Sequence, residues 1–235
     1  VRYADEIIVL STGIQEYFQM HYGRNTVFIP NGIKRPNILK AHRITKKWGL
    51  KKDTYILYVG RLVPEKGLDY LINAFKLTKT DKKLVIAGGS SDSTEFMENL
   101  KILAKNDLRI LFTGFVQGDI LEELYSNAYI YILPSDLEGM PLSLLEGMSY
   151  GNCCLTSDIK ECADVVENKA ILFKKGNIED LRNKIQMLCD DKRMVQSYKM
   201  TAADFICSKY NWDDVVSKTI QVYKNNLKNE KSLHK

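Results

Sequence analysis

The stretch YILYVGRLVPEKGLDYLINAF, residues 55–75, contains a strand, a turn and a helix in direct succession. Residues 55–59 are a short apolar run of the kind that forms a buried strand. A turn-rich segment then extends from Gly60 to Gly67. The apolar residues that follow recur at the spacing of an amphipathic helix, at Leu68, Leu71, Ile72 and Phe75. A strand followed directly by a helix is the repeating unit of a parallel α/β sheet.

The same alternation continues toward the C-terminus. Further apolar runs, separated by segments with helical spacing, occupy residues 84–87, 110–113, 129–133, 153–156 and 170–173. This alternation predicts an α/β fold with a Rossmann-like, doubly wound parallel sheet and helices on both of its faces. Several of the runs end in Gly or Pro. Tight turns at that edge are where open α/β sheets bind their ligands.

The composition excludes several classes of protein. The chain has 235 residues, of which 45% are hydrophobic and 27% charged, as in a soluble globular protein. Its longest unbroken apolar run, residues 128–133, is far shorter than the roughly 20 residues that span a bilayer. The net charge of +5 is scattered along the chain, so nucleic-acid binding is not expected.

Cysteine and histidine usage indicates neither a disulfide framework nor a metal centre. The five cysteines contain no Cys-x-x-Cys pair, and the three histidines lie in no recognisable motif. Acidic pairs such as Asp190-Asp191 are common on protein surfaces, and we do not interpret them as metal ligands. Reduced thiols are typical of a cytoplasmic protein.

The first candidate motif is the segment from Gly60 to Gly67, which lies between the predicted strand and helix. A strand–turn–helix junction presents free backbone N–H groups and the positive end of a helix dipole, which together favour an anion. Arg61 and Lys66 add two cations at the same edge, and Arg can bind phosphate oxygens in a bidentate manner. The alternative interpretation is a surface turn with solvated charges.

The second candidate motif is EGMPLSLLE, residues 138–146. Pro141 suits the first position of a helix, which places Glu138 in the preceding loop and Glu146 in the second turn. An ionised carboxylate can accept hydrogen bonds from two vicinal hydroxyls, so this pair suits a hydroxyl-rich ligand. The N–H groups expected to point, unpaired, toward an anion are those of Met140, Leu142 and Ser143. The alternative is an acidic residue that only complements the helix dipole.

Several short features occur in order along the chain: Pro30-Asn31-Gly32, Gly60-Arg61, Lys66-Gly67, Gly114-Phe115-Val116, Leu133-Pro134-Ser135, and Glu138 with Glu146. Together they resemble the donor-binding half of glycosyltransferase family 4 (group 1 glycosyltransferases). Enzymes of that family have the GT-B architecture of two facing Rossmann-like domains. The resemblance extends over nearly the whole chain, from residue 4 to residue 223.

The resemblance implies roles for individual residues. Arg61, Lys66 and Glu138 would be the catalytic positions: the two cations neutralise the diphosphate of a nucleotide-sugar, and Glu138 lies against the sugar. Glu146 would bind the ribose hydroxyls. The donor-binding positions that it implies are Gly60, Phe115, Val116, Gly139, Met140, Pro141, Leu142, Ser143 and Glu146. The donor, a UDP-, GDP- or ADP-sugar, is a substrate, and neither a cofactor nor a metal is expected.

The resemblance also implies an organisation and an activity. Residues 1–26 would be a remnant of an N-terminal domain with the hinge, residues 27–193 the nucleotide-sugar-binding domain, and residues 194–235 helices that pack back on the missing N-terminal domain. We expect a retaining glycosyltransferase of the hexosyltransferase type, acting on a saccharide or lipid-linked acceptor in polysaccharide biosynthesis. It would be cytoplasmic, at the inner face of the membrane through peripheral association, and inactive as this isolated chain.

Two departures from the family pattern concern the sugar-binding turn and the linker. Ile159-Lys160 precedes Glu161 where the family often has Gly-Gly, and Lys34 replaces a common acidic residue. Two other functions remain open. One is a non-catalytic nucleotide-sugar-binding subunit or module that needs a separate acceptor-binding chain. The other is a Rossmann oxidoreductase or a GT-B epimerase, although the glycine fingerprint of dehydrogenases is absent.

Overall fold

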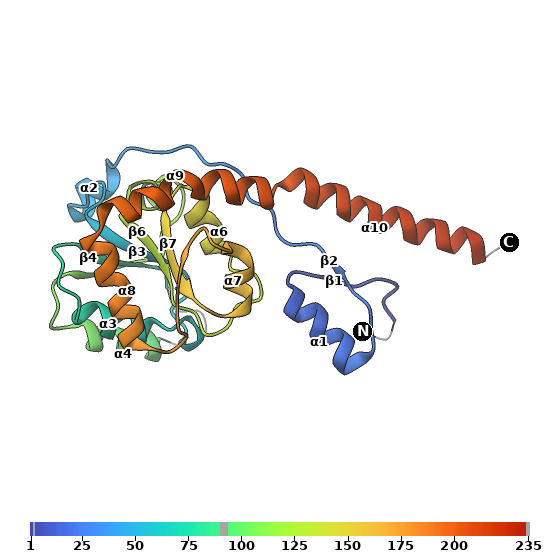
Figure 1. The fold of residues 1–235 in the computed structure, drawn as a ribbon, viewed down its shortest axis with the longest axis horizontal. Helices are drawn as coiled ribbons and strands as arrows, with labels where there is room; N and C mark the ends of the chain where they lie inside the picture. Colours follow the sequence, from blue (N-terminus) through green and yellow to red (C-terminus); the bar gives the residue numbers. More distant parts are fainter. Residues whose placement is uncertain (2, 90–93, 234–235) are drawn as a thin grey trace.

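A computed structural model describes residues 1, 3–89 and 94–233 (Figure 1). The strands are β1 (Ile8–Val9), β2 (Val27–Phe28), β3 (Tyr55–Val59), β4 (Lys83–Ala87), β5 (Ile110–Gly114), β6 (Ile130–Leu133), β7 (Cys153–Ser157) and β8 (Ile171–Phe173). The helices are α1 (Thr12–Tyr22), α2 (Arg43–Trp48), the short 3-10 helix η1 (Pro64–Lys66), α3 (Leu68–Lys76), α4 (Glu95–Ala104), α5 (Asp119–Asn127), α6 (Leu142–Ser149), α7 (Lys160–Val166), α8 (Ile178–Asp190), α9 (Lys192–Lys209) and α10 (Trp212–Leu233).

Strands β3 to β8 form one sheet in the order β5-β4-β3-β6-β7-β8, and every neighbouring pair is parallel. The chain builds outward from β3 to β5 and then returns to add β6 on the other side of β3. This is the order of a doubly wound Rossmann-like sheet, so the predicted fold class is confirmed. The direction of winding reverses between β3 and β6. The loops that follow these two strands therefore flank the crevice where such sheets bind ligands.

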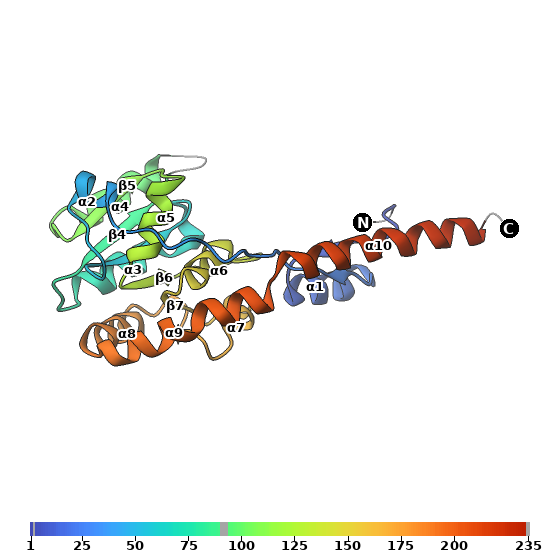
Figure 2. The same cartoon turned by 90° about the horizontal axis from the view of Figure 1, so that it is seen from above.

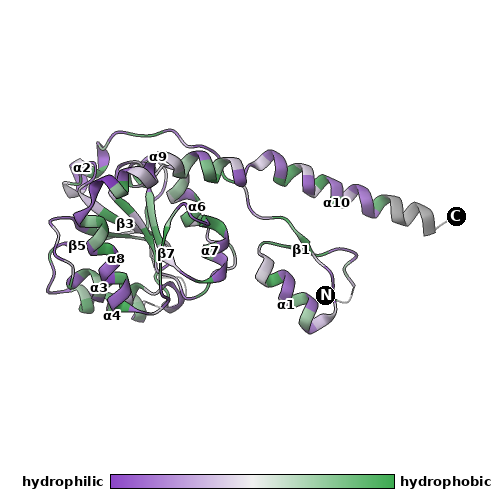
Figure 3. Cartoon of the chain, viewed as in Figure 1, coloured by the Kyte–Doolittle hydropathy of each residue, from purple (hydrophilic) through white to green (hydrophobic). Residues whose placement is uncertain are grey.

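The sheet is apolar because both of its faces are covered. The side chains of β6 and β7 are buried along their whole length, and the strands appear green in the interior of Figure 3. Helix α3 packs against α4 and α8, α2 against α5, and α6 against α9. Such burial of apolar surface is the main favourable contribution to folding.

Two predicted boundaries differ from the structure. Helix α6 begins at Leu142, and Pro141 precedes it as the N-cap residue rather than occupying its first turn. The boundary expected between residues 193 and 194 divides helix α9. That helix lies against α6 and β7, where it buries Val195, Ala202 and Ile206. The periodic pattern of α9 alone does not say which neighbour covers it.

The segments at the two ends extend away from the main sheet (Figures 1 and 2). Strands β1 and β2 form a small parallel sheet, and α1 lies beside it. The Thr12 hydroxyl donates a hydrogen bond to the Asp164 carboxylate, which links α1 to α7. Helix α10 projects from the end of α9, and between residues 212 and 227 its exposed apolar side chains are those of Trp212, Val216, Ile220, Tyr223 and Leu227. In the part of the chain that the structure describes, no helix is long and apolar enough to cross a membrane.

Candidate active site

The loops after β3 and β6 are joined at the point where the sheet reverses its winding. The Asp136 N–H donates a hydrogen bond to the Glu65 carbonyl over 2.8 Å, and the Tyr70 hydroxyl donates to the Asp136 carboxylate over 2.6 Å. Gly67, which ends η1 with a φ of 62°, lies directly against the Pro134 carbonyl. A side chain at position 67 would have to occupy the space of that carbonyl, so only glycine allows this close approach.

The joined loops bring Lys66 and Glu138 into contact. The Lys66 ammonium lies 2.6 Å from Oε1 of Glu138, and the side chains are 15% and 8% exposed. The buried Ser135 hydroxyl donates a hydrogen bond of 2.7 Å to the same oxygen. Glu138 is therefore held by one charge-assisted and one neutral hydrogen bond. A ligand that enters here meets a carboxylate whose position is already fixed.

Arg61 lies at the edge of this arrangement rather than in the ion pair. Its side chain is 60% exposed, and the guanidinium is 3.8 Å from Glu65. It lines a cavity of about 480 Å³ at the ends of β3, β4 and β5, together with Gly60, Gly88, Gly89, Phe115 and Val116. The structure thus places the predicted donor-binding positions Phe115 and Val116 beside Gly60 and Arg61.

Glu146 lines an adjoining cavity of about 390 Å³, and Leu121 contributes to both cavities. Lys34, the residue that departs from the family pattern, lines this second cavity with Glu146. The Tyr125 hydroxyl donates a hydrogen bond of 2.9 Å to Oε2 of Glu146. Burial raises the pKa of the Glu146 carboxyl, and the hydrogen bond from Tyr125 opposes that rise.

The start of α6 only partly matches the sequence-based prediction. The Leu142 N–H donates to the Met140 carbonyl over 2.9 Å, so the prediction that it points unpaired toward an anion is wrong. The turn at Pro141 folds the backbone back on itself and brings these two groups together. For Met140 and Ser143, no protein acceptor lies within hydrogen-bonding range among the described residues. Those two N–H groups remain available to a ligand.

A row of buried tyrosines, Tyr58, Tyr131 and Tyr125, underlies the loops. The Tyr58 hydroxyl donates to the Arg61 carbonyl over 2.9 Å, and burial raises the pKa of this phenol, so it remains neutral. A Cβ at Gly147 would lie 2.8 Å from the Tyr131 ring, so α6 can approach the row only because this residue is glycine. Sequence reasoning missed the row. The available signal was the presence of Tyr58 and Tyr131 within otherwise aliphatic strands, whereas Tyr125 lies in helix α5 and gave no such signal.

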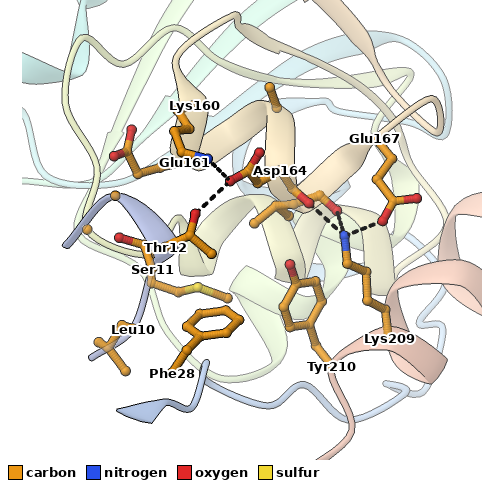
Figure 4. A pocket seen from close by; sticks show the side chains of 15 residues that line it. Leu10, Ser11, Thr12, Phe28, Lys160, Glu161, Asp164, Glu167, Lys209 and Tyr210 are labelled. Atoms are coloured by element: carbon orange, nitrogen blue, oxygen red, sulfur yellow. Dashed lines mark hydrogen bonds and ion pairs between the residues drawn. The ribbon is translucent and has the colours of Figure 1, made fainter. Parts of the chain in front are cut away.

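A third cavity, of about 370 Å³, lies on the side of the Glu138 loop that faces α1 (Figure 4). It is lined by Gly139 and Met140, by the start of α1 and by Lys160, Glu161 and Asp164 of α7. Asp164 accepts hydrogen bonds from both Thr12 and Lys160. Gly139 and Met140 therefore face a different cavity from Arg61 and Glu146. Of the predicted donor-binding positions, Gly60, Phe115 and Val116 line the cavity of Arg61, Glu146 lines the adjoining cavity, and Gly139 and Met140 line the third.

The charged side chains of the site that contact one another do so in pairs, namely Lys66 with Glu138 and Arg61 with Glu65. Within residues 1, 3–89 and 94–233, no group of three or more His, Cys, Asp or Glu side chains is arranged to hold a metal ion. Lys66, Arg61 and the two N–H groups at the start of α6 are the features that can receive an anion. Glu138 and Glu146 are the acceptors for hydroxyl groups.

A family model described as glycosyl transferases group 1 matches residues 41–205, which include both loops and the whole main sheet. The chain belongs to the group 1 glycosyltransferases. Among curated relatives, the chain is 31% identical over 173 residues to an uncharacterized glycosyltransferase of Methanocaldococcus jannaschii, covering 72% of this chain and 44% of the relative. It is 32% identical over 180 residues to an Escherichia coli protein named UDP-Gal:alpha-D-GlcNAc-diphosphoundecaprenol alpha-1,3-galactosyltransferase. That match covers 70% of this chain and 45% of the relative.

Solved structures of GT-B glycosyltransferases share the fold of this group 1 glycosyltransferase chain. HepE from Anabaena in complex with UDP and glucose has a TM-score of 0.86 at 19% identity, covering 95% of this chain and 64% of that one. Sucrose-phosphate synthase from Thermosynechococcus elongatus has a TM-score of 0.82 at 22% identity, covering 95% and 59%. The chain spans about half the length of the curated relatives that it matches.

Proposed function

We propose that this chain is the donor-binding portion of a retaining glycosyltransferase of family 4. In this proposal it binds a nucleotide-diphospho-sugar, whose sugar is transferred to a saccharide or lipid-linked acceptor. The observation that carries the proposal is the contact between Lys66 and Glu138 at the switch point of the sheet, beside two adjoining cavities and a helix start with available N–H groups.

The charges suit the chemistry of sugar transfer. When the bond between the sugar and the diphosphate breaks, negative charge develops on the departing nucleoside diphosphate. Lys66, Arg61 and the N–H groups of Met140 and Ser143 would stabilise that charge, as preorganised donors do in other active sites. With these groups in place, we propose that no metal is required.

The carboxylates would bind the hydroxyl groups of the donor. Glu138 would lie against the sugar, with its orientation fixed by Lys66 and Ser135. Glu146 would bind the ribose from the adjoining cavity, while the backbone at Phe115 and Val116 would contact the base in the cavity that Arg61 lines. Together these contacts would hold sugar, diphosphate and nucleoside along one path.

The comparisons support the choice of donor and acceptor. HepE was solved with UDP, and the galactosyltransferase relative is named for UDP-Gal and an undecaprenol-linked acceptor. We therefore place UDP first among the candidate nucleotides, ahead of GDP and ADP. A lipid-linked acceptor would bring the protein to the inner face of the membrane for polysaccharide biosynthesis.

A second candidate is a nucleotide-sugar-binding module that works with a separate acceptor-binding chain. The exposed apolar side chains of α10 favour it, because they offer a surface that another chain would cover. In either case we expect the isolated chain to bind donor without transferring sugar. Robust transfer by the isolated chain would contradict both this expectation and the second candidate.

The binding proposal is tested by titrating the chain with UDP, GDP and ADP in a calorimeter, with and without EDTA. We expect one of them to bind with an affinity that EDTA does not change. Loss of binding in EDTA would contradict metal independence, and NAD binding in place of all three would favour an oxidoreductase. No binding of any of the three nucleotides would contradict the proposed function.

A further inference from the structure

Within the described structure, the Glu138 carboxylate contacts the cationic Lys66, whereas the Glu146 carboxylate is bound by a neutral side chain alone, the hydroxyl of Tyr125. We propose that Tyr125 is a positioning residue, which holds one oxygen of Glu146 so that the other accepts hydrogen bonds from both hydroxyls of a ribose. This inference rests on the proposed function, because it assumes that a nucleoside diphosphate occupies the site. It goes beyond that function by assigning the recognition of ribose to a pair of residues on two helices.

The surroundings of Tyr125 leave its hydroxyl little freedom. The side chain is 1% exposed, and its ring stacks on Tyr150 with centroids 5.2 Å apart and an interplanar angle of 12°. The Tyr131 ring lies 5.8 Å away on another side. Because the phenol is rigid apart from two torsions, packing of the ring fixes the hydroxyl, and the hydroxyl fixes Oε2 of Glu146.

Glu146 lines a cavity, and only one of its two carboxylate oxygens is hydrogen-bonded within the described structure. Among the described residues, hydrogen bonding to the Glu146 carboxylate comes from Tyr125 alone and involves Oε2. Oε1 therefore retains both of its lone pairs, and one carboxylate oxygen can accept from two vicinal hydroxyls. The cavity of about 390 Å³ that Glu146 lines adjoins the one lined by Phe115 and Val116, as a ribose beside its base requires.

The charge state of Glu146 depends on the same contact. Burial raises the pKa of Glu146, and the Tyr125 hydrogen bond lowers it by favouring the ionised form. The other titratable groups around the carboxylate are Glu122 on α5, Tyr150 at the end of α6 and Lys34 in the segment between β2 and α2. Tyr125→Phe leaves these groups in place and removes the one hydroxyl that donates to Glu146.

The test compares ribonucleotides with analogues that lack the two ribose hydroxyls. The chain is titrated with UDP, GDP and ADP and with their 2′,3′-dideoxy forms, for the parent and for Tyr125→Phe. We expect Tyr125→Phe to lower the affinity for the ribonucleotide that binds by about five- to tenfold, which is the effect of losing one hydrogen bond. Binding of the dideoxy form should change less than about twofold, since it does not contact Glu146.

Tyr55→Phe is the matched control. The Tyr55 hydroxyl is also buried and donates to α5, at the Leu124 carbonyl over 2.7 Å, but it does not approach Glu146. It should lower stability as Tyr125→Phe does and leave nucleotide affinity unchanged. Tyr125→Phe should also move the acidic loss of ribonucleotide binding to higher pH, because the pKa of Glu146 rises when the hydrogen bond is removed.

The outcomes separate this inference from the proposed function. Equal weakening of the ribose and dideoxy ligands by Tyr125→Phe, or no weakening of either, would overturn the positioning role while nucleotide binding by the parent stands. The positioning role would also be contradicted if Tyr125→Phe did not shift the acidic loss of ribonucleotide binding to higher pH. If the parent binds none of the three ribonucleotides, the proposed function fails, and the positioning role fails with it.

Discussion

The helices on the main sheet and those of the terminal segments share an amphipathic sequence pattern, but they differ in how far their apolar faces are buried. Helix α3 buries Leu68, Leu71, Ile72, Ala74 and Phe75 between the sheet and its neighbours. Helix α10 has a comparable apolar stripe that remains exposed, and no residue of α1 is fully buried. The periodicity of a helix shows which face needs a partner, but stability comes only where that partner is present.

The largest expected effect of a single substitution is in the main sheet. Phe75→Ala removes a fully buried ring from α3, and we expect it to lower the free energy of unfolding by about 3–5 kcal/mol. Denaturation in urea measures this change. A loss below about 1 kcal/mol would mean that α3 is packed no better than the terminal helices, and the comparison would fail.

The next effect concerns the site that the main sheet positions. Lys66→Ala or Arg61→Ala should weaken nucleoside diphosphate binding roughly ten- to a hundredfold, because each removes a charge-assisted contact to phosphate. Calorimetry measures the change. Lys76→Ala is the matched control, because Lys76 is the last residue of α3 and its ammonium donates a hydrogen bond to the Leu103 carbonyl of α4. If Lys66→Ala and Arg61→Ala both bind like the parent, the diphosphate assignment is wrong.

A smaller effect is expected where α1 meets α7. Burial alone would raise the pKa of Asp164, but hydrogen bonds from Lys160 and Thr12 hold it below its usual value. A carboxyl whose pKa is lowered by folding stabilises the protein above its unfolded pKa, and that contribution disappears as the pH falls through the folded pKa.

We therefore expect Asp164→Asn to lower the free energy of unfolding at pH 7 by no more than about 1 kcal/mol, because the group is half-exposed, and to lower the thermal midpoint accordingly. The difference from the parent should shrink as the pH is lowered below 4. Scanning calorimetry of both proteins across this range measures it. A difference that grows toward acid pH would contradict the assigned cause.

The smallest effect is expected on α10. Tyr223→Ser should change the free energy of unfolding by less than about 0.5 kcal/mol, because the side chain is 66% exposed and contributes little to packing. Urea denaturation of the isolated chain measures it, with Phe75→Ala as the contrasting variant. A destabilisation above about 1 kcal/mol would show that this face is covered in solution, and the contrast between α3 and α10 would no longer hold.

The sequence was sufficient for the strands of the main sheet, because each is a short apolar run and four of the runs end at Gly60, Gly88, Gly114 or Pro134. The predicted strand 55–59 coincides with β3, and 84–87 and 153–156 differ from β4 and β7 by one residue. The alternation of apolar runs and helical segments also indicated a doubly wound parallel sheet, but it did not give the order of the strands. The packing of residues 194–235 on an N-terminal domain stays a prediction, and the contacts of α9 with α6 and β7 were not indicated by its periodicity.

The site was predictable only as a set of positions. Turn glycines and charges at strand ends indicated Arg61, Lys66 and Glu138, but not that Lys66 and Glu138 form an ion pair. The role of Tyr125 depends on a side-chain contact across 21 residues, which no local spacing indicates, whereas Ser135 lies only 3 residues before Glu138 and its contact depends on the loop conformation. The hydrogen bond of Leu142 was missed because it depends on the backbone angles at Pro141.

The contact of Gly67 with the Pro134 carbonyl has a consequence for how such a protein can change over time. Lys66 and Glu138 come from loops far apart in the chain, yet one missing side chain sets the distance between them. Neither loop can lengthen or shift alone without separating the two charges. Sequence drift in one loop must therefore be matched by drift in the other, and a library randomised at position 67 should yield almost only the parental residue among functional clones.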